Sequence, residues 1–176
     1  ENKKAIATRG KIITVGNWLR DWDFYFRVIK ECKNWEFILI NKMLDAKYKK
    51  MVHTFTNLTY LDNISDDELF THFLEADLQF MPLTGMAGSN AFLQGMALGC
   101  PTVITEVNND PILQNNDTVS FYRKNDIADC IDKMRIILNL SDEKLRENKY
   151  KANSYASLYS WEEVAKKTVE LYKQVV

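Results

Sequence analysis

Short hydrophobic runs alternate along the chain with longer segments whose apolar residues recur at helical spacing. The runs at 11–15 and 35–40 are too short and too continuous for an amphipathic helix, which favours buried strands. The run at 78–81 ends at Pro82, which has no amide to extend a strand ladder. By these criteria we expect strands over 11–15, 35–40, 58–61, 78–81, 102–105 and 119–121.

The segments between these runs have the spacing and the end signals of helices. Ser65 and Ser160 each precede a glutamate by three residues, the pattern of a capping box. From the helix that Ser65 begins we expect Leu69, Phe73 and Leu74 to point inward. We expect helices over 21–33, 41–50, 65–75, 89–98, 126–138, 142–156 and 161–175.

Strands that are hydrophobic throughout and alternate with helices are typical of a parallel sheet covered on both faces. We therefore expect an α/β fold, a Rossmann-like doubly wound parallel sheet of about six strands. Residues 1–176 are expected to form one domain, with the sheet core in 11–122. The helices of 124–176 have no strands between them, so we expect a helical cover or an arm that reaches another domain.

Composition narrows the chemistry only slightly. The formal net charge of −1 over 176 residues gives no reason to expect a nucleic-acid partner. No apolar run approaches the roughly 18 residues of a membrane helix, and the polar start does not resemble a signal peptide. Cys32, Cys100 and Cys130 form no metal-binding pattern, so we expect buried thiols in a cytoplasmic protein and no metal.

Two loops follow strands at the edge where an open parallel sheet binds its ligands, the carboxyl ends of its strands. One is 16–21, after the first strand, and the other is 83–90, after the fourth. The second loop has two glycines and then begins a helix through small residues, which let a ligand approach the backbone closely.

The start of that helix can present bare amides to an anion such as a diphosphate. We expect Gly88, Ser89, Asn90 and Ala91 to supply them, and Gln94, one turn further, to face the same cleft and bond a ribose diol. The alternatives are a plain strand-to-helix turn and a solvated glutamine. The two commonest phosphate fingerprints, GxGxxG and the Walker motif, are absent.

These residues carry a resemblance to a known family. Residues 78–105 resemble the donor-site segment of the large family of retaining glycosyltransferases that includes relatives of sucrose-phosphate and glycogen synthase. In that family a helix reads Glu-Ala-Met-Ala-x-Gly-x-Pro-Val-Ile, and 94–104 here reads Gln-Gly-Met-Ala-Leu-Gly-Cys-Pro-Thr-Val-Ile. The segments 13–16, 58–69 and 159–172 resemble the family's flanking pieces in the same order.

The resemblance implies the C-terminal, donor-binding half of a GT-B fold, in which two Rossmann-like domains enclose the active site. It implies a hexosyltransferase that moves a sugar from a nucleotide-diphosphate sugar to an acceptor with retention, using no metal and no other cofactor. The partners would be the nucleotide-sugar donor and the N-terminal acceptor domain of the same enzyme. Any peripheral membrane association would lie in that second domain, and this half alone is expected to be inactive.

The family's site residues carry over unevenly. Its two glutamates, eight positions apart, align with Met86 and Gln94, and the second of them contacts the donor ribose. Its phosphate-clamping Arg and Lys align with Asn17 and Trp22, and Arg20 between them is our candidate substitute. The alternative for Arg20 is a solvated charge at the helix start, paired with a neighbouring aspartate.

From the first loop we expect Gly16, Asn17 and Arg20 to contact the nucleotide sugar, and we assign no catalytic residue. A second hypothesis is a degenerate, non-catalytic module of the same fold that binds or regulates a partner. Met86, Gln94 and Asn17 favour that module because each departs from the family pattern.

Overall fold

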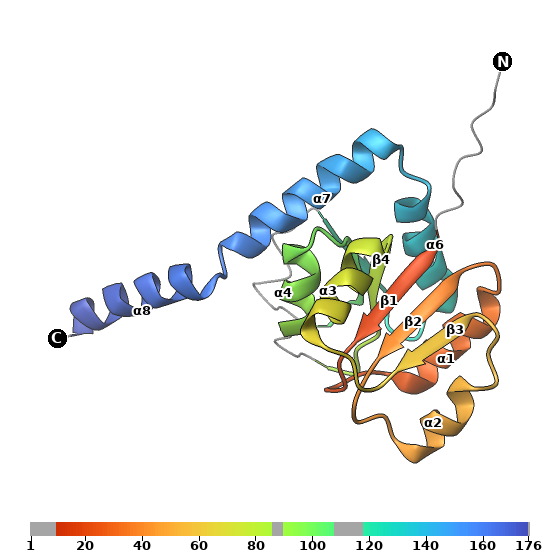
Figure 1. Cartoon of the computed structure of the whole chain (residues 1–176). Coiled ribbons are helices and arrows are strands. Elements are labelled where there is room, and N and C mark those ends of the chain that lie inside the picture. The colour runs from red at the N-terminus through yellow and green to blue at the C-terminus, as the bar shows by residue number, and fades with distance from the viewer. Residues whose placement is uncertain (1–9, 86–89, 108–117, 176) are drawn as a thin grey trace.

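A six-stranded sheet in the order β3-β2-β1-β4-β5-β6 forms the centre of the molecule (Figure 1). This computed structural model describes residues 10–85, 90–107 and 118–175. Every neighbouring pair of strands is parallel, so the predicted parallel sheet is confirmed. The strands are β1 (Lys11–Val15), β2 (Glu36–Ile40), β3 (Leu58–Leu61), β4 (Leu78–Met81), β5 (Thr102–Thr105) and β6 (Val119–Tyr122).

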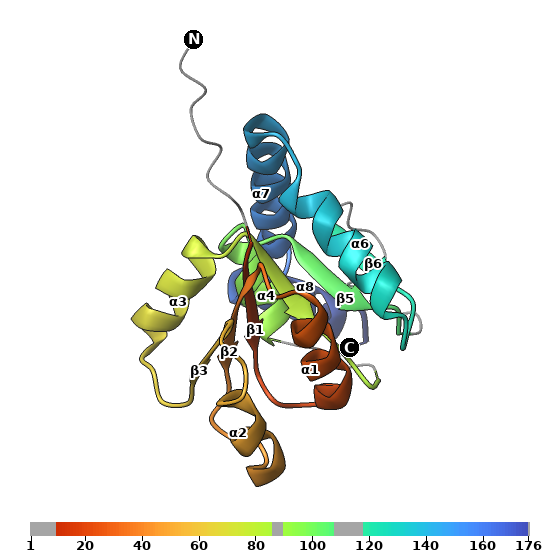
Figure 2. The same cartoon turned by 90° about the vertical axis from the view of Figure 1, so that its right-hand side faces the viewer.

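Helices cover both faces of this sheet, as the hydrophobic strands require. Figure 2 shows α3 on one side of the strands and α1 and α6 on the other. The alternation within β1 explains the two layers, since Ile12 packs with α1 and α6 while Ile13 packs with Phe73 of α3. The helices are α1 (Trp22–Glu31), α2 (Ala46–Val52), α3 (Asp66–Glu75), α4 (Asn90–Ala97), α6 (Ile127–Leu138), α7 (Asp142–Ser157) and α8 (Trp161–Val175).

The ends of α3 and α4 each depend on particular residues, and the capping box predicted at Ser65 is confirmed. Ser65 and Glu68 form the reciprocal capping box at the start of α3. Gly99 follows α4 with a φ of 72°, the left-handed conformation that a glycine adopts without strain.

Two expectations about helices were wrong. The segment 41–50 does not begin as a helix, because the Asn41 side chain accepts a hydrogen bond from the Met43 amide and holds a loop there until Ala46. Leu74 does not point inward and is 59% exposed. The next residue along α3 from Phe73 lies about 100° around the helix, so it turns away from the sheet, whereas Phe73 is buried and Leu69 packs against the same core, as expected.

The C-terminal helices leave the sheet in two steps. The first, α7, packs along α4, where the Asn153 amide donates to the Ala97 carbonyl. The second, α8, extends away from the body of the molecule (Figure 1). Among the helices that the structure describes, we find none with the length and apolar character needed to cross a membrane.

Candidate functional site

The strand order reverses between β1 and β4. From β1 the chain builds outward through β2 and β3, and then returns to place β4 on the free edge of β1. The loops that leave the carboxyl ends of β1 and β4 therefore lie side by side, with no strand between them. In open α/β sheets this switch point is where ligands bind.

These two loops are joined by a short antiparallel pairing. The Asp21 amide donates to the Pro82 carbonyl at 2.8 Å, and the Thr84 amide donates to the Leu19 carbonyl at 2.9 Å. Between these bonds Arg20 lies opposite Leu83 in a β-bridge. The pairing fixes the backbone of Arg20 relative to the end of β4.

Arg20 is a buried cation, with only 7% of its surface exposed. Its Nη2 donates to the Val15 carbonyl at 2.8 Å and its Nη1 donates to the Trp18 carbonyl at 3.1 Å. Among the described residues its Nε has no hydrogen-bond partner and no carboxylate forms an ion pair with it. Burial without a counter-charge lowers the pKa of Arg20 to about 10.

The alternative expectation for Arg20, a solvated charge paired with an aspartate, was therefore wrong. Asp23 pairs instead with Lys47 at 2.9 Å. The side chain of Asp21 caps α1 by accepting from the Phe24 amide. Both aspartates are thus engaged elsewhere, and the guanidinium folds back under its own loop.

Gly16 brings this guanidinium close to the start of α4. Its φ of 90° is left-handed, and a Cβ there would lie 3.3 Å from Nη2 of Arg20 and 3.9 Å from Cβ of Ala91. The absence of a side chain lets the three groups meet. The structure thus brings together Gly16, Arg20 and Ala91, which the sequence placed in one site.

Asn17 lies at the surface of the same loop, held by a buried neighbour. The Asn41 Nδ2 donates to the Asn17 Oδ1 at 3.1 Å, and the Asn41 carbonyl accepts from the Tyr60 hydroxyl at 2.8 Å. Asn41 itself is buried at the end of β2. This arrangement orients the amide group of Asn17 and joins the loops after β1 and β2.

In α4 the structure describes Asn90, Ala91 and Gln94, whereas Gly88 and Ser89 lie outside the described residues. Asn90 and Gln94 are exposed and one helical turn apart, so both side chains can reach a ligand at the helix start. Met86, which aligns with the family's first glutamate, also lies outside the described residues.

The side chain of Gln79 ties α4 to the sheet, a role that was not predicted from the sequence. It is fully buried in β4, its Nε2 donates to the Ala91 carbonyl at 2.9 Å, and its Oε1 accepts from the Thr102 hydroxyl at 3.2 Å. A Cβ on Gly95 would lie 2.4 Å from that Oε1. This explains why Gly95 stands where the family motif has alanine.

Asn41, Gln79 and Thr105, whose hydroxyl accepts from the Leu83 amide at the end of the loop pairing, were all missed, although one signal marks them. Each is a polar residue inside or at the end of an otherwise hydrophobic strand. Because a buried polar group is nearly always hydrogen-bonded, such a position predicts a specific partner even when the partner is unknown.

The other residues at or near the loops divide into core and surface. Trp22 is buried in the core and edge-on to Tyr25, so it is not available to a ligand, whereas Trp18 is exposed. The described residues hold no group of three or more His, Cys, Asp or Glu arranged to bind a metal ion. What remains is a site of positive charge, formed by the start of α4 and by a buried guanidinium that pairs with no carboxylate in the described part of the chain.

The strand order and the switch-point loops define a Rossmann-like α/β protein. The profile of the family described as glycosyl transferases group 1 matches residues 9–139, and the chain belongs to that family. It is therefore a glycosyltransferase-family domain with the fold of one half of a GT-B enzyme. A comparison with curated protein sequences found no match.

Solved structures show the same fold at low sequence identity. Sucrose-phosphate synthase from Thermosynechococcus elongatus matches with a TM-score of 0.79 at 15% identity, over 95% of this chain and 45% of its own. WaaG, a glycosyltransferase involved in lipopolysaccharide biosynthesis, matches with a TM-score of 0.71 at 14% identity, over 94% of this chain and 47% of its own. The catalytic domain of starch synthase IV from Arabidopsis thaliana, bound to ADP and acarbose, matches with a TM-score of 0.69 at 14% identity, over 97% of this chain and 39% of its own. This chain thus spans less than half of each.

Proposed function

We propose that this chain is the donor-binding half of a retaining hexosyltransferase and that it holds the diphosphate of a nucleotide sugar between Arg20 and the start of α4. The buried guanidinium, which has no carboxylate partner among the described residues, carries the proposal, because a buried charge is expensive unless something neutralises it. Gly16 leaves the space through which a phosphate would approach Nη2. The family membership supports a sugar donor as the source of that phosphate.

The same groups supply the chemistry that sugar transfer needs from this half. As the bond from the sugar to the diphosphate breaks, negative charge grows on the leaving diphosphate. A fixed guanidinium and the amides of a helix start stabilise that charge with little reorganisation, because they are already in place. This mechanism uses no metal, and it leaves Asn17, Asn90 and Gln94 to contact the sugar or the ribose.

The test is a titration of the protein with ADP, GDP and UDP by calorimetry, comparing wild type with Arg20→Gln. Charge-assisted hydrogen bonds contribute about 1.5–3 kcal/mol, so the substitution should weaken binding of the preferred nucleotide by about tenfold or more. Arg27→Gln is the matched control, since Arg27 is exposed on α1 and lies over the Phe24 ring.

Equal affinities for Arg20→Gln and wild type would contradict the assignment of the diphosphate to Arg20. If wild type binds none of the three nucleotides at millimolar concentration, the donor-binding proposal itself fails. The non-catalytic module would then be the better description of the chain.

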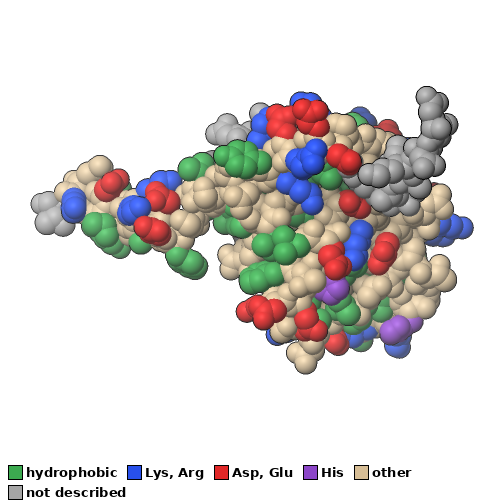
Figure 3. All heavy atoms as spheres, turned by 45° about the horizontal axis from the view of Figure 1, so that its top comes forward, with side chains coloured by type: hydrophobic (Ala, Val, Ile, Leu, Met, Phe, Trp, Pro, Cys, Tyr) green, Lys and Arg blue, Asp and Glu red, His purple; other side chains and the backbone are tan. Residues whose placement is uncertain are grey.

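We further propose that α8 packs on a second, acceptor-binding domain, without which this half does not turn over. Trp161 at its start is 88% exposed, and Leu171 and Tyr172, about three turns later, are also exposed. Figure 3 shows hydrophobic side chains gathered along one side of the protruding helix. Solved GT-B neighbours extend over more than twice the length that this chain matches, which supports a second domain as the cover.

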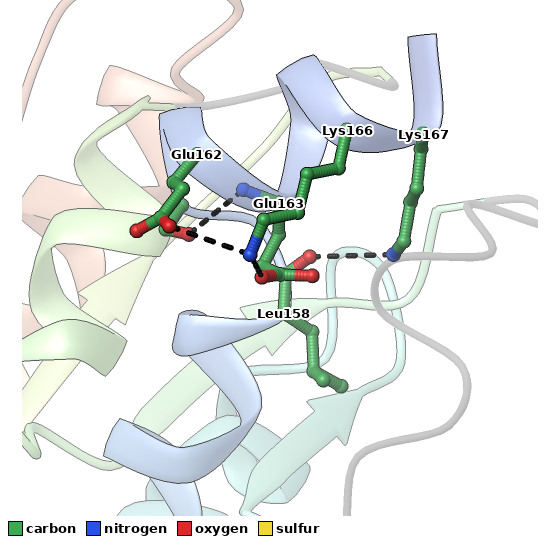
Figure 4. Close-up of polar contacts among 6 residues, drawn as sticks. Leu158, Glu162, Glu163, Lys166 and Lys167 are labelled. Carbon is green, nitrogen blue, oxygen red and sulfur yellow. Dashed lines mark hydrogen bonds and ion pairs between the residues drawn. The ribbon is translucent and has the colours of Figure 1, made fainter. Parts of the chain in front are cut away.

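The other side of α8 is charged and internally paired. Lys166 contacts Glu163 at 2.8 Å and Glu162 at 3.3 Å, and Lys167 donates to the Leu158 carbonyl at 3.4 Å across the bend from α7 (Figure 4). Exposed ion pairs of this kind add little stability, but they keep this side polar. The apolar side is therefore the one we expect to become protected from hydrogen exchange when the second domain is present.

The cytoplasmic location expected from the sequence is part of the same proposal. Cys32, Cys100 and Cys130 are all buried free thiols, which suits a reducing compartment.

A further inference from the structure

The loop after β4 is held by a side chain where the strand ladder stops. Pro82 has no amide, so the next donor along the chain is the Leu83 amide. That amide donates to Oγ1 of Thr105, at the end of β5, over 2.7 Å in a buried setting. A side-chain hydroxyl thus takes the place of a strand carbonyl as the acceptor for the first amide after β4.

The Thr105 hydroxyl is itself fixed from the other side. The Tyr122 hydroxyl on β6 lies 2.6 Å from Oγ1 of Thr105. Tyr122 is buried, its ring stacks on Phe24 at 5.3 Å, and burial raises the pKa of its phenol. With its partner locked in the core, Thr105 has little freedom to reorient.

Leu83 connects Thr105 to Arg20 through the backbone. It lies opposite Arg20 in the β-bridge between the two loops, and the bonds from Asp21 to Pro82 and from Thr84 to Leu19 flank that bridge. Displacement of the Leu83 amide would therefore shift the backbone of Arg20.

We infer that Thr105 is a positioning residue that sets the place of Arg20 through Leu83 and so determines how well the site holds a diphosphate. The inference rests on the proposed function for its ligand but on the described hydrogen bonds for its geometry. Thr105 acts on the anion only through Arg20, which separates this role from a general contribution to stability.

The experiment measures nucleotide affinity for Thr105→Val, which keeps the shape of the side chain and removes the hydroxyl. We expect affinity for the preferred nucleoside diphosphate to fall at least fivefold, and Thr105→Ser to restore it to within twofold of wild type. Thr14→Val is the matched control: Thr14 is equally buried and donates to the Phe80 carbonyl, but it holds no loop amide. Its affinity should stay within twofold of wild type.

Combination with Arg20→Gln distinguishes positioning from a general loss of structure. If Thr105 acts through Arg20, Thr105→Val should change affinity less than twofold once Arg20 has been replaced. Independent, multiplying effects of the two substitutions would overturn the inference while leaving the proposed function intact. So would an equal loss of affinity in Thr14→Val.

A measurement without ligand covers the case in which the proposed function fails. Amide hydrogen exchange should become at least tenfold faster at Asp21, Leu83 and Thr84 in Thr105→Val and stay unchanged there in Thr14→Val. If wild type binds no nucleotide, the donor proposal falls and this measurement decides the geometric part alone. Unchanged exchange at the three amides would overturn that part as well.

Discussion

Gly95 and Gln79 form an interlocking pair, and replacement of Gly95 by alanine should show it. Alanine is normally the better helix residue by about 1 kcal/mol, so in an ordinary helix Gly→Ala would stabilise. Here the added Cβ would meet Oε1 of Gln79 at 2.4 Å and Cε1 of Phe73 at 3.1 Å. The buried amide would have to move from its bonds with Ala91 and Thr102.

The size of the effect follows from these contacts. A buried polar group that loses its partner costs about 1–3 kcal/mol, and overpacking a tight core costs about as much. Together the two costs are about 2–6 kcal/mol, from which we subtract about 1 kcal/mol for the gain in helix propensity. Gly95→Ala should therefore destabilise by about 1–5 kcal/mol, and each kcal/mol lowers the melting temperature by about 3 °C for a chain of this size.

The assay is urea unfolding followed by circular dichroism, with Gln79→Val as the second background. Valine is too short to meet the new Cβ, so Gly95→Ala should then be neutral or stabilising by up to about 1 kcal/mol. The sign of the alanine effect should thus reverse between the two backgrounds. A stabilising Gly95→Ala in wild type, or effects that add within about 0.5 kcal/mol, would refute the interlock.

Three further outcomes are expected. Ser65→Ala should cost about 1 kcal/mol through loss of the α3 cap, and an unchanged urea midpoint would contradict this role. The pKa of Glu147 lies at about 2, below the usual 4.5, because two lysines of α7 donate to it. Its contribution to stability is therefore present above about pH 4.5 and is lost as the pH falls toward 2. In an NMR titration Glu147 should take up its proton at a lower pH than a glutamate in an unfolded peptide does, and high salt should reduce the difference. Burial raises the pKa of Cys32 to about 11 and of Cys100 to about 12, so both should resist a thiol reagent at pH 8 until urea unfolds the chain, and rapid labelling of folded protein would count against their burial.

The fold was predictable because the strands of a parallel sheet are hydrophobic on both faces. Such runs as 11–15 and 78–81 stand out in sequence without knowledge of their neighbours. The start of α2 was not predictable, since the Asn41 side chain competes locally with helix formation. Leu74 was misplaced because α3 buries a narrower face than the spacing of its apolar residues suggests.

The location of the site was predictable from the sequence, but the residues that hold Arg20 and α4 in place were not. Gly16 and Ala91 follow from the rule that ligands bind at the carboxyl ends of strands. Arg20 was predicted because it lies between the two positions at which the family has its phosphate-binding Arg and Lys and this chain does not. The burial of Arg20 depends on carbonyls that face inward only once its loop pairs with the loop after β4. The partners of Gln79 and Thr105 lie on other elements, more than ten residues away along the chain, so no local pattern reveals them.

The central place of β1 has a consequence for synthesis of the protein. As this domain is synthesised, β1 can pair with β2 and β2 with β3, but the other edge of β1 stays open until β4 arrives, because Ile12 pairs with Leu78. During that interval a hydrophobic strand edge is exposed to other chains, a known route to aggregation. We therefore expect slow translation between β3 and β4 to lower the yield of folded protein, and a chaperone that shields nascent strands to restore it.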